Sequence, residues 1–104
     1  MAWIVLVASG VLEAVWAAAL DESEGFSRLA PTIVFLVALA LSMAGLAFAM
    51  RSIPLGTAYA VWVGIGAVLT ATYAVATGGE PISVAKVVLL GGIVVCVVGL
   101  KLLE

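Results

Sequence analysis

The sequence predicts an all-α membrane protein with four transmembrane helices per protomer. Of its 104 residues, 66% are hydrophobic and only 10% are charged, and the mean hydropathy is +1.40. A soluble domain of this size needs far more polar surface than this composition supplies. The apolar residues form four runs, each close to the roughly 20 residues that cross a hydrocarbon core. Helices are expected because every backbone group must be paired within lipid, and barrel strands would alternate polar and apolar residues.

The four helices are predicted at about residues 2–20, 29–50, 54–77 and 84–103, within a single domain over residues 1–104. The first run has no Lys or Arg ahead of it and contains an acidic residue, so we interpret it as a true span and not as a signal peptide. A polar connector from Asp21 to Arg28 separates it from the second run. The second run ends at Arg51.

The third run begins at Pro54, a residue suited to the first turn of a helix. It ends where Gly78, Gly79 and Pro81 break the helical pattern. The fourth run then continues to Lys101 and the residues after it. Since the connectors are short, consecutive helices are expected to be antiparallel neighbours.

The basic residues give no preferred orientation in the membrane. Four spans place Arg51 and Lys101 on one side, and Arg28 and Lys86 on the other. The positive-inside rule compares Lys and Arg between the two sides, and here the numbers are equal. Two interpretations stay open. Either short loops contain few charges, or the chain inserts in both orientations and pairs as an antiparallel homodimer.

Several function classes are excluded by composition. The net charge is −2, and no basic stretch suggests nucleic acid as a partner. There is no His and one Cys, which excludes an internal disulfide and a His/Cys metal cluster. Cys96 lies in an apolar run and is interpreted as a small hydrophobic residue. We therefore expect no cofactor and no metal.

Glu13 is the candidate functional residue, because it stands alone in an apolar span. An ionisable group at the membrane centre costs about 2.5–3.5 kcal/mol on insertion scales and marks a functional site. Ser9, Gly10, Trp16 and Ala17 share its helix face. Small neighbours allow close approach, and the indole offers a ring face and one N–H donor. The alternative is that Trp16 is an ordinary interfacial aromatic residue.

The third span also has a helix face on which small and aromatic residues recur. Gly56, Tyr59, Trp62 and Gly66 fall on one helix face. An aromatic belt would explain the Tyr and Trp but not the glycines. Gly10, Gly56 and Gly66 are predicted to provide space in a cavity. Gly64 and Gly66 together are predicted to form a flexible point in the middle of this helix.

The second and fourth spans complete the set of candidates. Ser42 either donates to a carbonyl of its own helix or donates to the Glu13 carboxylate. Gly92 and Gly99 recur seven residues apart in the fourth span, a spacing typical of helix association in membranes. We assign that span to dimerisation and the other three to the site.

These residues are sufficient for exchange of a cation for protons. A desolvated carboxylate must hold either a proton or a cation, so the two compete for Glu13. Alternating access needs two states of similar energy, and an antiparallel homodimer supplies them when its protomers exchange conformations.

With these motifs in view, the chain resembles the small multidrug resistance transporters over its whole length. The resemblance rests on the Glu of the first span and on three further segments: Gly25 to Arg28, Pro54 to Trp62, and Gly92 to Gly99. The run from Glu13 to Ala17 resembles the guanidinium-exporter subtype, in which a Trp follows the Glu by three residues.

The resemblance implies an antiparallel, dual-topology homodimer in a bacterial plasma membrane that exchanges guanidinium for protons. It implies that Glu13 of each protomer is the shared proton and substrate site, surrounded by Trp16, Ser42, Tyr59 and Trp62. One departure concerns topology. The family usually has a Lys near the end of the first helix, where this chain has Asp21.

Three alternatives to a guanidinium exporter remain open on the sequence. The first is a broader exporter of quaternary ammonium or aromatic cations. The second is a non-transporting subunit that uses Glu13 to recruit a basic partner helix, and the third is half of a heterodimeric transporter. Substrate comparison separates the first from guanidinium export, because quaternary ammonium ions lack N–H groups for paired hydrogen bonds.

Overall fold

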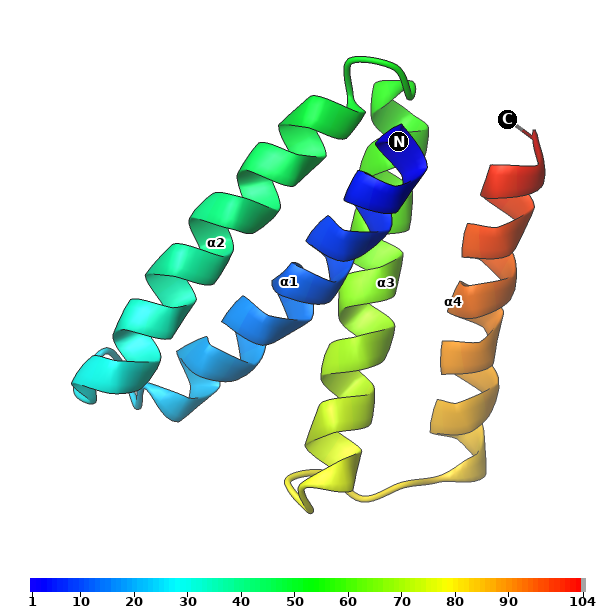
Figure 1. The fold of residues 1–104 in the computed structure, drawn as a ribbon. Helices are drawn as coiled ribbons and strands as arrows, with labels where there is room; N and C mark the ends of the chain where they lie inside the picture. Colours follow the sequence, from blue (N-terminus) through cyan, green and yellow to red (C-terminus); the bar gives the residue numbers. More distant parts are fainter. Residues whose placement is uncertain (104) are drawn as a thin grey trace.

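The computed structural model describes residues 1–103, which form four α-helices and their connecting segments (Figure 1). The helices are α1 (Ala2–Glu22), α2 (Leu29–Ala49), α3 (Leu55–Ala76) and α4 (Val84–Leu103). All four are long and apolar enough to cross a membrane. The predicted class, an all-α membrane protein with four spans, is confirmed.

The helix ends differ from the predicted bounds by one or two residues. Helix α1 continues through Asp21 and Glu22, since polar side chains at the end of a span can lie outside the hydrocarbon. Pro54 precedes α3 and does not lie in its first turn. Its backbone is extended, with φ −54° and ψ 145°, and its carbonyl accepts the Ala58 N–H at 2.9 Å.

Helix α1 is the centre of the packing. It contacts α2 and α3 along much of its length, whereas α2 and α3 meet only slightly, and the backbone of α4 closely approaches α3 alone. In Figure 1, α4 stands at the edge beside α3, and the beginning of α1 lies at the same end of the bundle as the end of α4. One side-chain contact joins those two ends, with Lys101 Nζ 4.9 Å from the centre of the Trp3 ring.

The hydrophobic core lies at one end of the bundle. Its buried members come from the start of α1, the end of α2, the connector that follows α2 and the start of α3: Leu6, Leu46, Ala49, Ile53, Ala58, Val61 and Trp62. Toward the opposite end, α1 and α2 diverge from α3 (Figure 1). The divergence leaves a groove of about 630 Å³ between the three helices, with Glu22 and Arg28 at its polar edge.

The close packing of α1 against α2 and α3 depends on glycine. A Cβ at Gly10 would lie 2.9 Å from the Ile65 side chain and 3.4 Å from the Trp62 carbonyl oxygen. A Cβ at Gly45 of α2 would collide with the Ser9 hydroxyl. Glycine at these two positions therefore lets α1 approach α3 on one side and α2 on the other.

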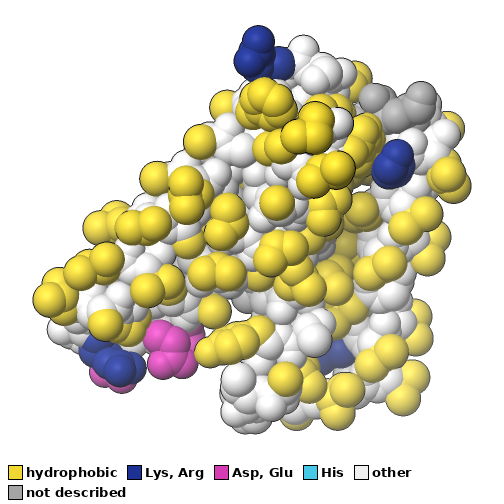
Figure 2. Space-filling model, viewed as in Figure 1, with side chains coloured by type: hydrophobic (Ala, Val, Ile, Leu, Met, Phe, Trp, Pro, Cys, Tyr) yellow, Lys and Arg dark blue, Asp and Glu magenta, His cyan; other side chains and the backbone are white. Residues whose placement is uncertain are grey.

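The outer surface is apolar, as expected for a chain in lipid. Figure 2 shows hydrophobic side chains over most of one face, with charged side chains gathered at the two ends. Helix α4 contributes no buried residue between Val84 and Leu103. A Cβ at Gly92 or Gly99 would meet no other atom within 4 Å, so this face of α4 is uncovered in a single protomer.

Candidate functional site

The Glu13 side chain of α1 lies directly against Gly66 of α3. A Cβ at Gly66 would collide with Oε1 and Cδ of Glu13, and would lie 2.8 Å from its Cγ. Oε1 is buried and has no hydrogen-bond partner among residues 1–103. The structure thus brings together two of the predicted residues, and the missing side chain at Gly66 provides the space for the carboxylate.

Trp16 lies one turn after Glu13 on the same helix. Its indole Nε1 is buried and likewise has no hydrogen-bond partner in the described chain. Its ring packs edge-to-face against Phe35 of α2, with ring centres 5.9 Å apart and planes inclined at 74°. An unpaired acceptor and an unpaired donor therefore occupy adjacent turns of α1.

Ser42 joins three helices through one hydroxyl group. The hydroxyl is fully buried, donates to the Ser9 carbonyl of α1 at 2.7 Å, and accepts the Trp62 indole N–H of α3 at 3.0 Å. Both predicted partners of Ser42 are therefore wrong for this structure, in which it bonds neither a carbonyl of its own helix nor Glu13. The reason is the close approach of α1 and α2 at Gly45, which brings the Ser9 carbonyl within reach.

The Ser9 carbonyl connects this network to Glu13. In a regular helix the carbonyl of residue i accepts the N–H of residue i+4, so Ser9 is the backbone partner of Glu13. Ser42 and Trp62 consequently brace the helical turn that carries the carboxylate, although neither contacts the carboxylate by a hydrogen bond.

Tyr59 and Trp62 stack on one face of α3, as their spacing predicts. Their ring centres are 5.8 Å apart, with planes inclined at 35°. Trp62 is almost fully buried, whereas about half of Tyr59 is exposed. Gly56 begins the same stripe, but a Cβ there would meet nothing within 4 Å, so the structure shows no close packing at this position.

The two central glycines of α3 have packing partners on different helices. Helix α3 runs unbroken from Leu55 to Ala76 through both. A Cβ at Gly64 would lie 2.6 Å from Val97 of α4, whereas Gly66 faces Glu13 of α1. Their observed role is close approach, and flexibility at this point stays a prediction.

Sequence reasoning missed two contacts near the site. Ser9 is noticeable from its place one turn before Glu13, but the acceptor is its backbone carbonyl, which no side-chain pattern indicates. Phe35 contacts Trp16, but an aromatic residue within an apolar run looks like any lipid-facing residue. Neither contact could be identified without the crossing of α1 and α2.

Comparison with known proteins identifies the family of this chain. The family described as Small Multidrug Resistance protein matches residues 1–101. The chain belongs to the small multidrug resistance family. This confirms the resemblance seen in the sequence. The members of this family are transporters and not enzymes, and the chain is a multi-pass transporter of the bacterial inner membrane.

Individual relatives are similar over almost their full length. A protein of Yersinia pseudotuberculosis named guanidinium exporter is 55% identical over 102 residues, which is 98% of this chain and 98% of the relative. Proteins with the same name from Salmonella typhimurium and Citrobacter freundii are 49% and 50% identical, covering 98% of this chain and 97% of each relative.

Proposed function

We propose that this small multidrug resistance protein exports guanidinium ion and small substituted guanidines in exchange for protons. Glu13 binds proton and substrate alternately, and the functional unit is an antiparallel, dual-topology homodimer. The observation that carries the proposal is the Glu13 carboxylate oxygen, which is buried in a span without a donor. Burial without compensation at such a depth is costly and is typical of a residue that binds an ion or a proton.

The proposed substrate follows from the relatives and from the chemistry of the site. The relatives that carry the name guanidinium exporter are 49–55% identical to this chain. Guanidinium is planar and offers paired N–H donors, which match a carboxylate. It also stacks on aromatic faces, and the rings of Trp16, Tyr59 and Trp62 lie on the helices that form the site.

The other predicted residues take supporting roles in this proposal. Trp16 and Tyr59 line the substrate path, while Ser42 and Trp62 hold the turn of α1 that carries Glu13. Gly10 and Gly66 provide the space in which α1, α3 and the carboxylate fit together. Gly56 contributes open space on the Tyr59 face, and Gly64 with Gly66 allow α3 to bend during exchange.

The proposed homodimer is supported by the uncovered face of α4. A transmembrane helix without a buried residue has a face available for a second copy, and small residues favour close helix contact in lipid. The uncovered Gly92 and Gly99 mark that face. Two oppositely inserted copies exchanging conformations would give outward- and inward-facing states of equal energy.

Transport in proteoliposomes tests the function. With a proton gradient across the membrane, vesicles that contain the purified protein are expected to take up guanidinium and to release protons in exchange. Tetramethylammonium should be a poor substrate because it has no N–H group to pair with Glu13. Uptake of tetramethylammonium at the rate of guanidinium would instead indicate a broader cation exporter. Binding of guanidinium without proton movement would contradict the proposed antiport.

The single cysteine offers a test of α4 association. Cys96 is exposed and lies midway between Gly92 and Gly99. Two α4 helices that cross at these glycines bring the two copies of Cys96 close together. A short membrane-permeant bifunctional thiol reagent is therefore expected to give a covalent dimer on denaturing gels. Cys96→Ser should abolish the product, and a parent protein that stays monomeric under these conditions would contradict association through α4.

Asp21 provides a test of dual topology. It lies at the Arg28 and Lys86 end of the bundle, where no ion pair joins it to another described residue. Asp21→Lys adds a cation to that end, so this end is expected to become predominantly cytoplasmic. A C-terminal tag labelled from either side of the membrane measures the change. Asp21→Asn is the matched control and should leave the two orientations balanced, because acidic residues carry little weight in the rule. A fixed orientation of the parent chain would exclude the homodimer.

A further inference from the structure

Three aromatic rings connect the first loop to the site. Phe26 of the loop lies 5.7 Å from Phe35 of α2, with planes inclined at 55°, and Phe35 lies 5.9 Å from Trp16. Both separations fall within the range that aromatic pairs favour, and the edge-to-face geometry of Phe35 and Trp16 is a preferred one. The Phe35 ring therefore separates an exposed loop residue from a residue one turn away from Glu13.

The loop that presents Phe26 has an unusual backbone. Glu24, Gly25 and Phe26 have consecutive positive φ angles of 49°, 71° and 69°. Residues other than glycine rarely adopt this left-handed conformation, and it persists only where neighbouring contacts fix it. The conformation at Phe26 is thus imposed by its surroundings.

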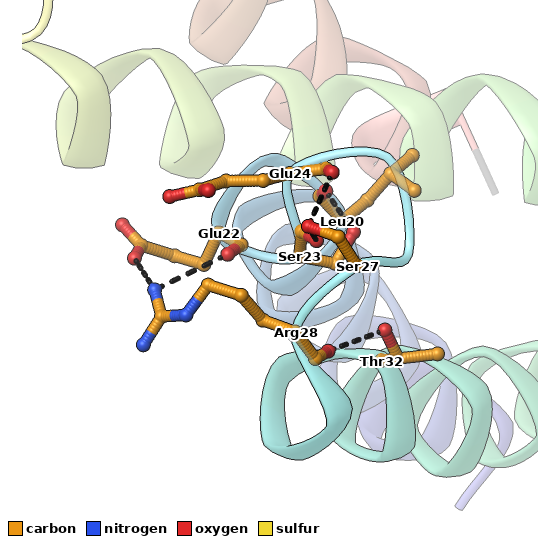
Figure 3. A network of polar contacts seen from close by, with 7 residues as sticks. All are labelled: Leu20, Glu22, Ser23, Glu24, Ser27, Arg28 and Thr32. Atoms are coloured by element: carbon orange, nitrogen blue, oxygen red, sulfur yellow. Dashed lines mark hydrogen bonds and ion pairs between the residues drawn. The ribbon is translucent and has the colours of Figure 1, made fainter.

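Ser23 supplies the contacts that fix the loop. It is fully buried, and its hydroxyl donates to the Leu20 carbonyl at 2.7 Å and accepts the Phe26 N–H at 3.1 Å. Its carbonyl accepts the N–H groups of Ser27 at 2.9 Å and of Arg28 at 3.0 Å. Figure 3 shows Leu20, Ser23 and Ser27 of this turn, with the Arg28 side chain reaching back to Glu22. The loop is a rigid turn that holds Phe26 in place.

The orientation of the Trp16 indole matters because its N–H is buried and unpaired. Guanidinium has only donors, so the indole N–H can serve the Glu13 carboxylate but not the substrate. The separation of Trp16 from Phe35 and the angle between them determine which way the indole faces.

We propose that Phe35 is a positioning residue of the transport site, held by the Ser23–Phe26 turn, and that it sets the orientation of Trp16 beside Glu13. The substrate consequence rests on the proposed function, whereas the positioning of Trp16 does not. Loss of the Phe35 ring frees the indole to rotate, weakens guanidinium binding and reduces discrimination against bulkier cations. The loop therefore acts on the site through aromatic contacts, at a distance from the carboxylate.

Fluorine NMR of protein labelled with 5-fluorotryptophan tests the positioning directly. The chain has three Trp residues, and Trp16→Phe assigns the Trp16 resonance. Phe35→Leu is expected to move and broaden that resonance without any substrate present. Phe35→Tyr retains the ring and should restore the parent spectrum. Phe48→Leu, which removes the ring of an α2 residue that packs near Arg51, is the matched control and should leave the Trp16 signal unchanged.

Two further variants test the contribution of the loop. Phe26 is more than half exposed, so Phe26→Leu removes its ring contact with little risk to folding. Ser23→Ala removes the acceptor of the Phe26 N–H. Both are expected to move the Trp16 resonance in the same direction as Phe35→Leu, by a smaller amount. An unmoved resonance in both variants would overturn the part assigned to the loop.

Binding measurements complete the test. Phe35→Leu is expected to weaken guanidinium binding roughly two- to tenfold, the scale of one aromatic pair. If the parent chain fails to bind guanidinium, the proposed function is wrong, while the resonance still reports on Trp16. An unchanged Trp16 resonance in Phe35→Leu would overturn the positioning role itself, whatever the substrate.

Discussion

Glu13→Gln is expected to abolish proton-coupled guanidinium exchange. Gln has nearly the same shape as Glu, so the contact with Gly66 is retained. It can neither release a proton nor provide a negative charge for the cation. Loss of a charge-assisted hydrogen bond typically costs about 1.5–3 kcal/mol, which corresponds to roughly 10- to 150-fold in affinity. Exchange is lost completely because the proton site disappears together with the charge.

Proteoliposome uptake measures the loss of proton-coupled exchange in Glu13→Gln, and calorimetry measures the loss of guanidinium affinity separately. Circular dichroism and the thermal midpoint in detergent should match the parent, since the substitution preserves volume. Glu22→Gln is a suitable control, because Glu22 is exposed at the end of α1 and its ion pair with Arg28 is a long 3.5 Å. Such a pair contributes little to stability. Intact proton-coupled uptake by Glu13→Gln would rule out Glu13 as the shared site.

The fold could be predicted from the sequence because few physical terms determine it. Four long apolar runs in lipid have to form helices, and the breaks at the first loop and after Gly78 fix their ends to within one or two residues. The prediction is wrong at Pro54, and this error is local. The ring permits proline in the first turn, but here it precedes the helix and supplies the first carbonyl acceptor.

The candidate residues were identifiable from their chemistry, but their contacts were not. Glu13 and Gly66 both stood out, yet nothing in the spacing indicates that one occupies the space left by the other. Helical periodicity orders residues on each helix, whereas a contact between helices depends on how they cross.

Ser42 shows this limit most clearly. A serine in an apolar span has several acceptors within reach, and the one nearest in space is decided by how closely α2 approaches α1. That approach depends on Gly45, which allows the Ser9 hydroxyl and carbonyl close to α2. The resulting network braces the backbone of α1, a role that no pattern of side chains indicates.

Gly66→Ala is expected to weaken guanidinium binding while leaving the protein folded. The added methyl group would occupy the place of Glu13 Oε1 and Cδ, so the carboxylate has to rotate away. Overpacking of this kind costs about 1–3 kcal/mol, or roughly 5- to 150-fold in affinity if it falls on the binding geometry. Alanine also favours the helix by up to about 1 kcal/mol relative to glycine, which offsets part of the loss in global stability. Affinity should therefore fall more than stability.

Two comparisons isolate the displaced carboxylate as the cause. Gly91→Ala makes the same change on α4, where the new Cβ would meet nothing within 4 Å, and should leave guanidinium affinity as in the parent. Glu13→Asp shortens the side chain by one methylene group and withdraws the carboxylate from α3. In the Gly66→Ala background it should recover part of the lost affinity, although alone it is expected to weaken binding. Equal guanidinium affinities of Gly66→Ala and the parent would contradict this prediction. They would show that the Glu13 carboxylate binds guanidinium from a position that does not depend on the space at Gly66.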